Sequence, residues 1–209
     1  MYNLTKEEET FLSTLDTPSK IQDFLDTLSF NHEEHGETCM SPRRVLRERK
    51  AHCVEGALLA STCLLLQNRQ PLIVSLRVTE NDYDHVITIY KENGLFGALS
   101  MTNHAVLGFR DPIYRSIREL ALSYFHEYFL TTTGEKTLRG YSRILNLKQF
   151  GTNWITEENE LFHIPKAISN KPHTRIFPKG TENHLRNADS MTRYTASISK
   201  EAFSKKRTS

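Results

Sequence analysis

A cysteine and a histidine, 32 positions apart, are the residues of this sequence that could do chemistry together. Cys53 opens a small-residue, apolar run, AHCVEGALLASTCLLL, and His85 lies in a later segment, DHVITIY. A thiol becomes a good nucleophile when a helix N-terminus and a neighbouring imidazole stabilise its thiolate. We therefore expect Cys53 to attack an acyl carbon, while His85 takes the thiol proton and returns it to the leaving group.

A third polar side chain is expected to orient the imidazole, and the predicted hairpin around KENG, residues 91–94, limits the choice. Side chains alternate between faces along a strand, so the loop length decides which residues lie beside His85. If the loop is the Asn-Gly step alone, His85 faces Thr102 and Ser100 lies beside it.

A loop of three residues, 92–94, changes this register. His85 then faces Met101, and Asn103 lies one step along the strand. The longer loop gives the better apolar match between the two strands. We therefore predict Asn103 as the orienting residue and keep Ser100 as the alternative.

The neighbours of the two reactive residues, Asp84 and His52, could shape the site. Adjacent residues on a helix point in different directions, so ordinary surface or capping roles are the simpler expectation for His52 and Glu55. Asp111 could also be a third group, but its place before a proline favours a helix cap.

Two observations bear on whether Cys53 differs from an ordinary cysteine. Unpaired cysteine is commonly a small buried hydrophobe, and Cys63, among leucines, fits that description. Nothing between Ser41 and Cys53 forces a helix to break. A continuous helix there would remove the effect of a helix N-terminus on the thiol.

Three potential metal ligands, His32, His35 and Cys39, lie close together in the sequence. Closed zinc sites usually contain paired motifs such as CxxC, and this chain has none. We therefore expect no metal ion and no other cofactor. The expected ligand is an amide- or peptide-containing substrate.

Composition bounds the class of protein. With 27 basic and 25 acidic residues, the formal net charge is +2, too small a field to favour nucleic acid as the main partner. No apolar run approaches the ~20 residues of a membrane span, and the N-terminus lacks the features of a secretion signal. The three cysteines are an odd number, which fits free thiols in a reducing compartment. We expect a cytoplasmic protein that does not enter a membrane.

Local signals predict helices first and strands after them. Thr5, Thr17 and Ser41 are typical helix caps, and the apolar run 53–66 is typical of a buried helix. Residues 72–78, 84–90 and 95–101 are typical of strands. Asp111-Pro112 then suggests the start of a long amphipathic helix.

The 209 residues suffice for one domain with a core. We predict this single domain over residues 1–165 and a weakly ordered, polar, basic tail over 170–209. Within the domain we expect an N-terminal helical part (1–50), the cysteine helix and sheet (51–110), a long helix (111–133) and a packing segment (135–165).

Several of these segments resemble a known group of proteins. AHCVEGALLA, DHVITIY, GALSMTNHAVLGFRDPIYRSIRELALSYFHEYF and GEKTLRGYS are similar to bacterial proteins of unassigned function in the transglutaminase-like, papain-related superfamily. The resemblance covers about residues 17–154. It implies an α+β fold in which a core helix carrying the nucleophilic cysteine packs on a small antiparallel sheet, with His85 and the third residue on adjacent strands.

The sequence departs from the family pattern at two positions. An aspartate is usual about fifteen residues after the histidine, where this chain has Ser100. The usual tryptophan two residues after the histidine is replaced by Ile87. Two hypotheses follow: a cysteine hydrolase or transamidase with a triad of Cys53, His85 and Asn103, or a catalytically inactive binding or scaffolding protein that keeps the fold.

Overall fold

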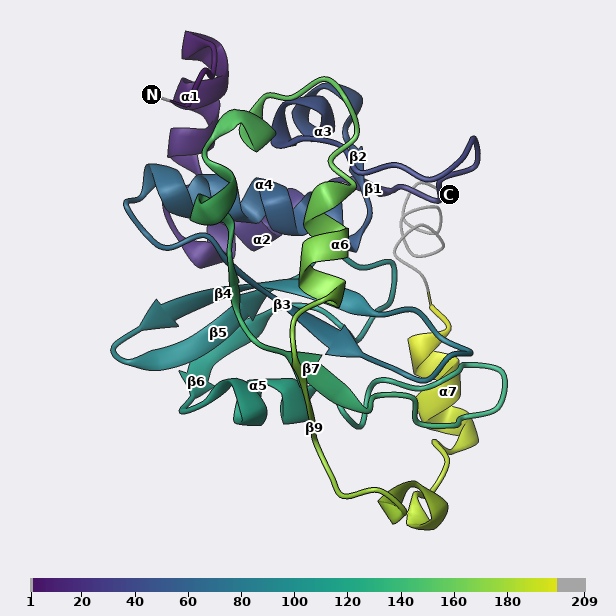
Figure 1. Cartoon of the computed structure of the whole chain (residues 1–209). Helices are drawn as coiled ribbons and strands as arrows, with labels where there is room; N and C mark the ends of the chain where they lie inside the picture. The colour runs from purple at the N-terminus through teal and green to yellow at the C-terminus, as the bar shows by residue number, and fades with distance from the viewer. Residues whose placement is uncertain (1, 199–209) are drawn as a thin grey trace.

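Helices and strands form separate layers in the computed structural model, which describes residues 2–198. Helices α1 to α4 gather on one side of a sheet, and α5 lies on the other side (Figure 1). The protein therefore has a mixed α+β fold. Within the described residues the helices are α1 (Lys6–Thr14), α2 (Pro18–Asp26), α3 (Pro42–Glu48), α4 (Cys53–Leu66), α5 (Ile117–Ser123), α6 (His163–Ser169) and α7 (Ser190–Ala196), with short 3-10 turns at Leu147–Phe150, Asn153–Ile155 and Thr181–His184.

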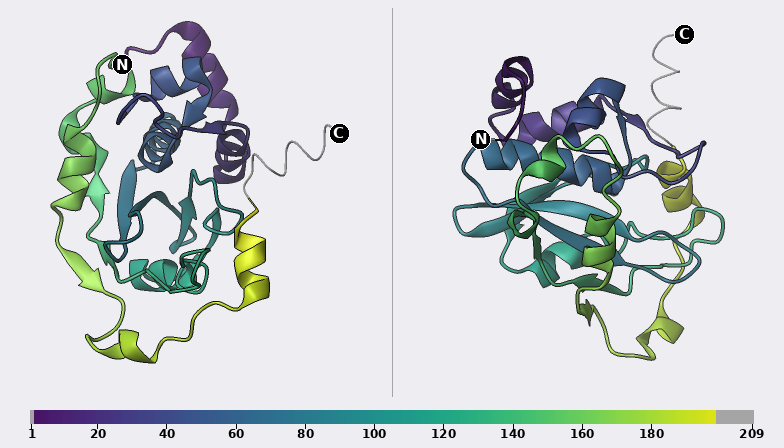
Figure 2. Two further views of the ribbon diagram at one scale, coloured as in Figure 1. Left: turned by 90° about the vertical axis from the view of Figure 1, so that its right-hand side faces the viewer. Right: turned by 45° about the horizontal axis from the view of Figure 1, so that its top comes forward.

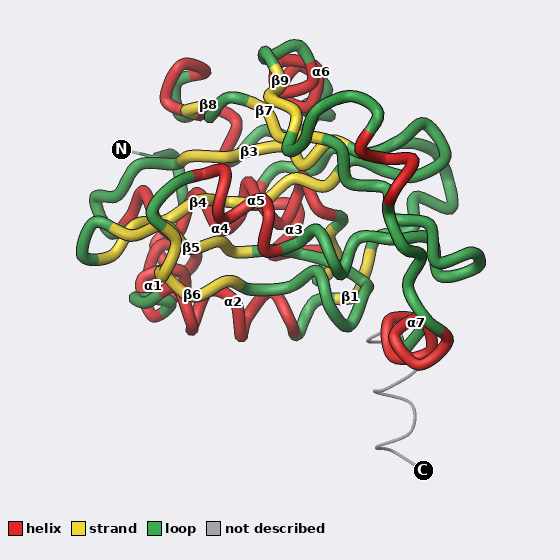
Figure 3. The backbone as a smooth tube through the Cα atoms, turned by 90° about the horizontal axis from the view of Figure 1, so that it is seen from below, coloured by secondary structure: helices red, strands yellow, loops and turns green. Residues whose placement is uncertain are grey.

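The main sheet is antiparallel, with the strand order β6-β5-β4-β3-β7-β9 and with β8 also paired to β3. Seen from below, these strands lie side by side in this order across the molecule (Figure 3). A separate parallel pair joins β1 and β2. The strands are β1 (Ser29–Phe30), β2 (Lys50–Ala51), β3 (Leu72–Arg77), β4 (His85–Glu92), β5 (Leu95–Leu99), β6 (Arg110–Tyr114), β7 (Gly140–Ser142), β8 (Leu145–Asn146) and β9 (His173–Arg175).

The core lies on both faces of this sheet. On one face, apolar side chains of α4 pack against Ile73 and Val86. On the other face, Ile87 and Ile89 of β4 join Leu120 of α5 in a second cluster. The central strand β4 is therefore covered on both sides. No helix within residues 2–198 combines the length and the apolar character needed to cross a membrane.

The first three helices begin where the sequence predicted. Thr5, Thr17 and Ser41 each accept a hydrogen bond from the backbone N–H three residues further on. Pro18 and Pro42 occupy first helical positions, where a missing N–H costs nothing. These caps confirm the predicted starts of α1, α2 and α3.

A break separates α3 from α4. Arg49 adopts the left-handed region with φ of 56° and ends α3, and the chain then forms β2. The helix α4 starts anew at Cys53, with His52 as its N-cap. Cys53 therefore occupies the first position of a helix of 14 residues, where unpaired backbone N–H groups favour a negative charge.

The hairpin between β4 and β5 has the shorter of the two loops considered. The loop consists of Asn93 and Gly94, with φ of 49° and 84°, as a two-residue turn of type I′ requires. The three-residue loop is wrong. The apolar match could not select the register, because both faces of β4 are buried. The register that forms places Ser100, not Asn103, beside His85.

The long helix predicted for residues 111–133 is also wrong. Residues 110–114 form β6, and α5 is a helix of 7 residues that begins after its N-cap, Ser116. Pro112, expected at the start of a helix, lies in β6. A proline fits there because β6 is at the edge of the sheet, where one side of the strand needs no ladder donors.

The C-terminal segment is structured as far as residue 198, contrary to the weakly ordered tail predicted from 170. β9 pairs with β7, and Ile176 is buried in the core cluster on the α5 side. Helix α7 is capped by Asp189 and lies at one edge of the molecule (Figure 2). The structured region therefore extends well past the predicted boundary at residue 165. The predicted tail at 199–209 lies outside the described residues.

Candidate active site

Three element ends meet at the candidate site. Cys53 is the first residue of α4, His85 is the first residue of β4, and Ser100 follows the last residue of β5. The hydroxyl of Thr88 in β4 donates to the carbonyl oxygen of Ala57 in α4 at 2.8 Å, which ties the helix to the strand. The packing of α4 on β4 thus brings together two residues that are far apart in the chain.

The Cys53 thiol has a strongly lowered pKa. Burial raises this pKa, but hydrogen bonding and charge from His52 and His85 outweigh burial and lower it to about 5. Burial raises the pKa of Cys39 and of Cys63 to about 12. Both are buried, whereas Cys53 is partly exposed. At neutral pH, one thiol of the three is therefore a thiolate.

The hydrogen bonds around Ser100 determine which ring nitrogen of His85 carries the proton. The Ser100 hydroxyl donates its only hydrogen to the carbonyl oxygen of Leu107 at 2.6 Å. It can then only accept from Nε2–H of His85, at 2.7 Å. The neutral imidazole consequently has its lone pair on Nδ1, which is free to receive a proton from the thiol. Ser100 thus makes the hydrogen bond to the His85 ring that was expected of the third residue.

Asn103 does not take that position. Its Oδ1 atom is buried and has no hydrogen-bond partner within residues 2–198, and Nε2 of His85 is bonded to Ser100. Beyond β5 the chain turns, and the backbone N–H of His104 donates to the hydroxyl of Thr102 at 3.1 Å. Burial, together with the charge of His85, lowers the pKa of His104, so this ring also lies near the site.

His52 caps α4 and also faces the thiol. Its Nδ1 accepts from the backbone N–H of Val54 at 3.1 Å, and its Nε2–H donates to the carbonyl oxygen of Thr38 at 3.0 Å. Burial lowers the pKa of His52, but the neighbouring Cys53 and Glu55 outweigh burial and raise it to about 9. The capping geometry belongs to the neutral ring, which a pKa of about 9 makes the minor form at neutral pH. A proton on Nδ1 would end the bond from Val54 and supply a donor to the thiolate instead.

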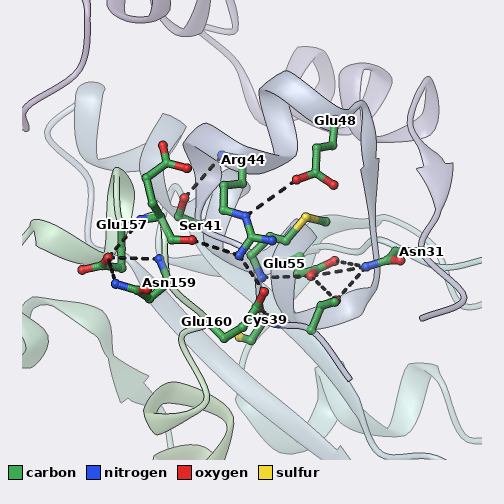
Figure 4. A network of polar contacts seen from close by, with 12 residues as sticks. Asn31, Cys39, Ser41, Arg44, Glu48, Glu55, Glu157, Asn159 and Glu160 are labelled. Atoms are coloured by element: carbon green, nitrogen blue, oxygen red, sulfur yellow. Dashed lines mark hydrogen bonds and ion pairs between the residues drawn. The ribbon is translucent and has the colours of Figure 1, made fainter. Parts of the chain in front are cut away.

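Glu55 is a fully buried carboxylate whose partners all donate to it. It accepts from the backbone N–H groups of Met40 at 2.9 Å and His52 at 2.8 Å. It also accepts from Thr38 Oγ1 at 2.8 Å and Asn31 Nδ2 at 3.1 Å (Figure 4). The predicted capping role of Glu55 is confirmed, but the sequence did not show that this side chain also anchors the loop at 31–40.

A second carboxylate holds the same loop from the opposite side. Glu160 accepts from the backbone N–H of Cys39 at 2.5 Å and from Arg44 Nη1 at 2.7 Å (Figure 4). Residues 38–40 are therefore fixed between Glu55 and Glu160. Because Thr38 also accepts from His52, this loop fixes the His52 ring beside Cys53.

Asp84, predicted to shape the site, acts on the turn before β4. Its Oδ1 accepts from the backbone N–H of Val78 at 2.9 Å, which closes the loop between β3 and β4. The hydroxyl of the buried Tyr128 donates to the carbonyl oxygen of Tyr83 at 2.5 Å. These contacts set the chain direction as it enters β4 at His85.

No known family model matches this chain, and no curated protein matches it at a significant level. The site must therefore be interpreted from its own geometry. Within residues 2–198, no three His, Cys, Asp or Glu side chains gather in a way that could hold a metal ion. The chemistry of the described groups is that of a thiolate beside two imidazoles.

Two substitutions of His52 should separate its capping role from its effect on the thiol. Asparagine is a good N-cap but carries no positive charge, so His52→Asn should keep the helix start and raise the pKa of Cys53 by about one unit. At a pH above 9, where the neutral ring caps α4, His52→Ala should also lose about 1 kcal/mol of unfolding free energy. The checks are the pH midpoint of Cys53 alkylation and the urea unfolding curve. An unchanged midpoint in His52→Asn would leave His52 with a capping role alone.

Proposed function

We propose that this protein is a cysteine-dependent acyl-transfer enzyme that hydrolyses or exchanges an amide or peptide bond. The observation that carries the proposal is the Cys53 thiol, placed at the first position of α4 beside His85, with its pKa lowered to about 5. A structural cysteine has no need of a stabilised thiolate, whereas a nucleophile does. The proposed catalytic residues are Cys53 and His85, and Ser100 is the orienting residue.

The proposed reaction begins with the thiolate of Cys53 and the imidazolium of His85. The sulfur bonds to the acyl carbon, and the carbonyl π electrons move to the oxygen. When the tetrahedral intermediate collapses, the bond to the leaving nitrogen breaks and that nitrogen takes the proton from Nδ1 of His85. A water or an amine then gives a proton to His85, attacks the thioester and releases the Cys53 thiolate.

The start of α4 offers a donor for the oxyanion of the tetrahedral intermediate. The N–H of a residue at the first helical position has no intrahelical acceptor, so the backbone N–H of Cys53 is available. This donor belongs to the same residue as the attacking sulfur, and the helix dipole favours negative charge beside it. We assign the backbone of Cys53 to oxyanion stabilisation.

The transglutaminase-like fold is part of this proposal. In its support, the cysteine helix α4 packs on the antiparallel strand β4, which begins with His85. Ser100 stands where an aspartate is usual in the resembling family. A hydroxyl orients the His85 ring but, unlike a carboxylate, adds no charge. The stabilisation of the Cys53 thiolate therefore depends more on His52 than it would if an aspartate stood at position 100. We also propose an amide- or peptide-containing partner, and a cytoplasmic location because the three cysteines are free thiols.

Acyl-enzyme trapping tests the proposal. The protein would be incubated with a library of activated aryl esters and anilides, and each cysteine would be examined by intact and peptide mass spectrometry. We expect an acyl adduct on Cys53 and product release that disappears in Cys53→Ala. The matched control is Cys63→Ala, which changes a buried thiol in the same helix and should keep both signals. Absence of any Cys53-dependent adduct or turnover would favour the inactive binding protein.

A further inference from the structure

Gln22 of α2 is bonded to the backbone of Ser100 through both ends of its side-chain amide. Its Nε2 donates to the carbonyl oxygen of Ser100 at 2.9 Å, and its Oε1 accepts from the N–H of Ser100 at 2.9 Å. The two residues are 78 positions apart, and Gln22 is only 5% exposed. A side-chain amide thus stands where the peptide group of a neighbouring strand would stand.

Ser100 needs this support because the sheet ends beside it. The last pair between β4 and β5 joins Thr88 to Leu99, and the last pair between β5 and β6 involves Ala98. Neither neighbouring strand is therefore paired with Ser100. Without Gln22, a buried N–H and a buried carbonyl oxygen would lose their partners, and such groups are costly to leave unpaired.

The orientation of the Gln22 amide is fixed by the groups that it meets. A backbone N–H can only donate and a carbonyl oxygen can only accept, so Oε1 and Nε2 cannot be exchanged. Nε2 also donates to Asp26 Oδ1, one turn further along α2, at 3.0 Å. Both hydrogens of the amide are therefore in use, and rotation of the side chain would break three hydrogen bonds.

We propose that Gln22 is a positioning residue that acts on the catalytic pair through Ser100. Three hydrogen bonds hold Ser100. Two join its backbone N–H and carbonyl oxygen to the Gln22 amide, and the third runs from its own hydroxyl to the carbonyl oxygen of Leu107. Together they place Oγ at 2.7 Å from Nε2 of His85. The inference rests on the proposed function, and it adds helix α2 to the elements that position the catalytic pair.

A pair of glutamine substitutions tests this role. Gln22→Met keeps the length of the side chain and removes all three bonds. Gln67→Met is the matched control: Gln67 ties the end of α4 to the carbonyl oxygen of Leu15 at 2.7 Å, far along the helix from Cys53. We expect Gln22→Met to raise the pH midpoint of Cys53 alkylation by about one unit, a roughly tenfold slower reaction well below the midpoint. Gln67→Met should leave the midpoint unchanged.

Three further measurements keep the test decisive. Adding Gln22→Met to Ser100→Ala should shift the midpoint no further, because Gln22 acts through the Ser100 hydroxyl. The Nε2–H proton resonance of His85 should broaden or disappear in Gln22→Met. If Gln22→Met does not fold, Gln22→Glu takes its place, since it keeps the acceptor for Ser100 N–H and loses the donor to its carbonyl oxygen.

The outcomes distinguish this inference from the proposed function. An unchanged midpoint in Gln22→Met, an equal shift in Gln67→Met, or additive effects in the double variant would overturn the positioning role while leaving Cys53 a nucleophile. A wild-type protein without a low alkylation midpoint would contradict the proposed function itself. In that case the His85 resonance still reports whether Gln22 holds Ser100 against the ring.

Discussion

Replacing His85 by alanine should slow the alkylation of Cys53 at pH 6 by about tenfold. With a pKa of about 5, roughly nine-tenths of the Cys53 thiol is thiolate at that pH. The His85 ring lowers this pKa through hydrogen bonding and charge, and its loss leaves only His52 to oppose burial. Removing both rings should return the pKa to at least the free value of about 8.5, which lowers the thiolate fraction at pH 6 about 300-fold.

The measurement is the second-order rate of iodoacetamide alkylation at Cys53, followed by peptide mass spectrometry. His104→Ala is the matched control, because this ring lies close enough to interact with His85 but does not lower the pKa of Cys53. It should change the rate by less than about twofold. Equal rates in His85→Ala and the wild type would show that the imidazole does not stabilise the thiolate.

Replacing Glu55 by alanine should cost about 3–5 kcal/mol of unfolding free energy, a large share of the stability of a typical domain. The fully buried carboxylate accepts from four groups, and alanine would leave those donors without an acceptor. Glu55→Gln should cost less, about 2 kcal/mol, because one of the two oxygens remains an acceptor. Urea unfolding curves would measure both values.

Glu158 provides the control for Glu55. Its carboxylate lies at the surface and pairs with Arg47 at 2.9 Å, with more than half of each side chain exposed. Glu158→Gln should leave the urea midpoint unchanged, since exposed ion pairs contribute little to stability. A Glu55→Ala protein as stable as Glu158→Gln would mean that the buried carboxylate does not hold the loop at 31–40.

Much of the fold follows from signals that act within a few residues. The caps at Thr5, Thr17 and Ser41 were predicted because a side-chain oxygen satisfies an N–H only three positions away. The apolar run of α4 and the β-branched segments of β3 and β4 likewise formed as predicted. The packing of α4 on β4 then brought Cys53 and His85 together.

The wrong predictions arose where tertiary contacts decide the outcome. Apolar alternation selects a register only when one face of a strand is exposed to solvent, and β4 is buried on both faces. Pro112 is compatible with a helix start and with an edge strand, and only the sheet order decides between them. The wrong register led to the wrong assignment of Asn103 as the third residue. The Asn-Gly turn by itself indicated the two-residue loop and therefore Ser100.

Other parts of the site had weak signals or none. The helix break before Cys53 depends on a left-handed Arg49, a conformation that the sequence does not mark. His52 followed three residues later by Glu55 resembles a capping box and could have indicated the start of α4. The bonds from Gln22 to Ser100 join segments 78 residues apart, so no local pattern predicts them.

The pH dependence of alkylation of each cysteine in the native wild-type protein tests the central claim most directly. Iodoacetamide labelling would be measured from about pH 4 to 9 and resolved by peptide mass spectrometry. The thiolate geometry predicts that Cys53 reacts with a midpoint near 5, while Cys39 and Cys63 remain unlabelled until the protein is denatured. A Cys53 midpoint near 8.5, the value of a free cysteine, or equal labelling of all three thiols, would contradict the account.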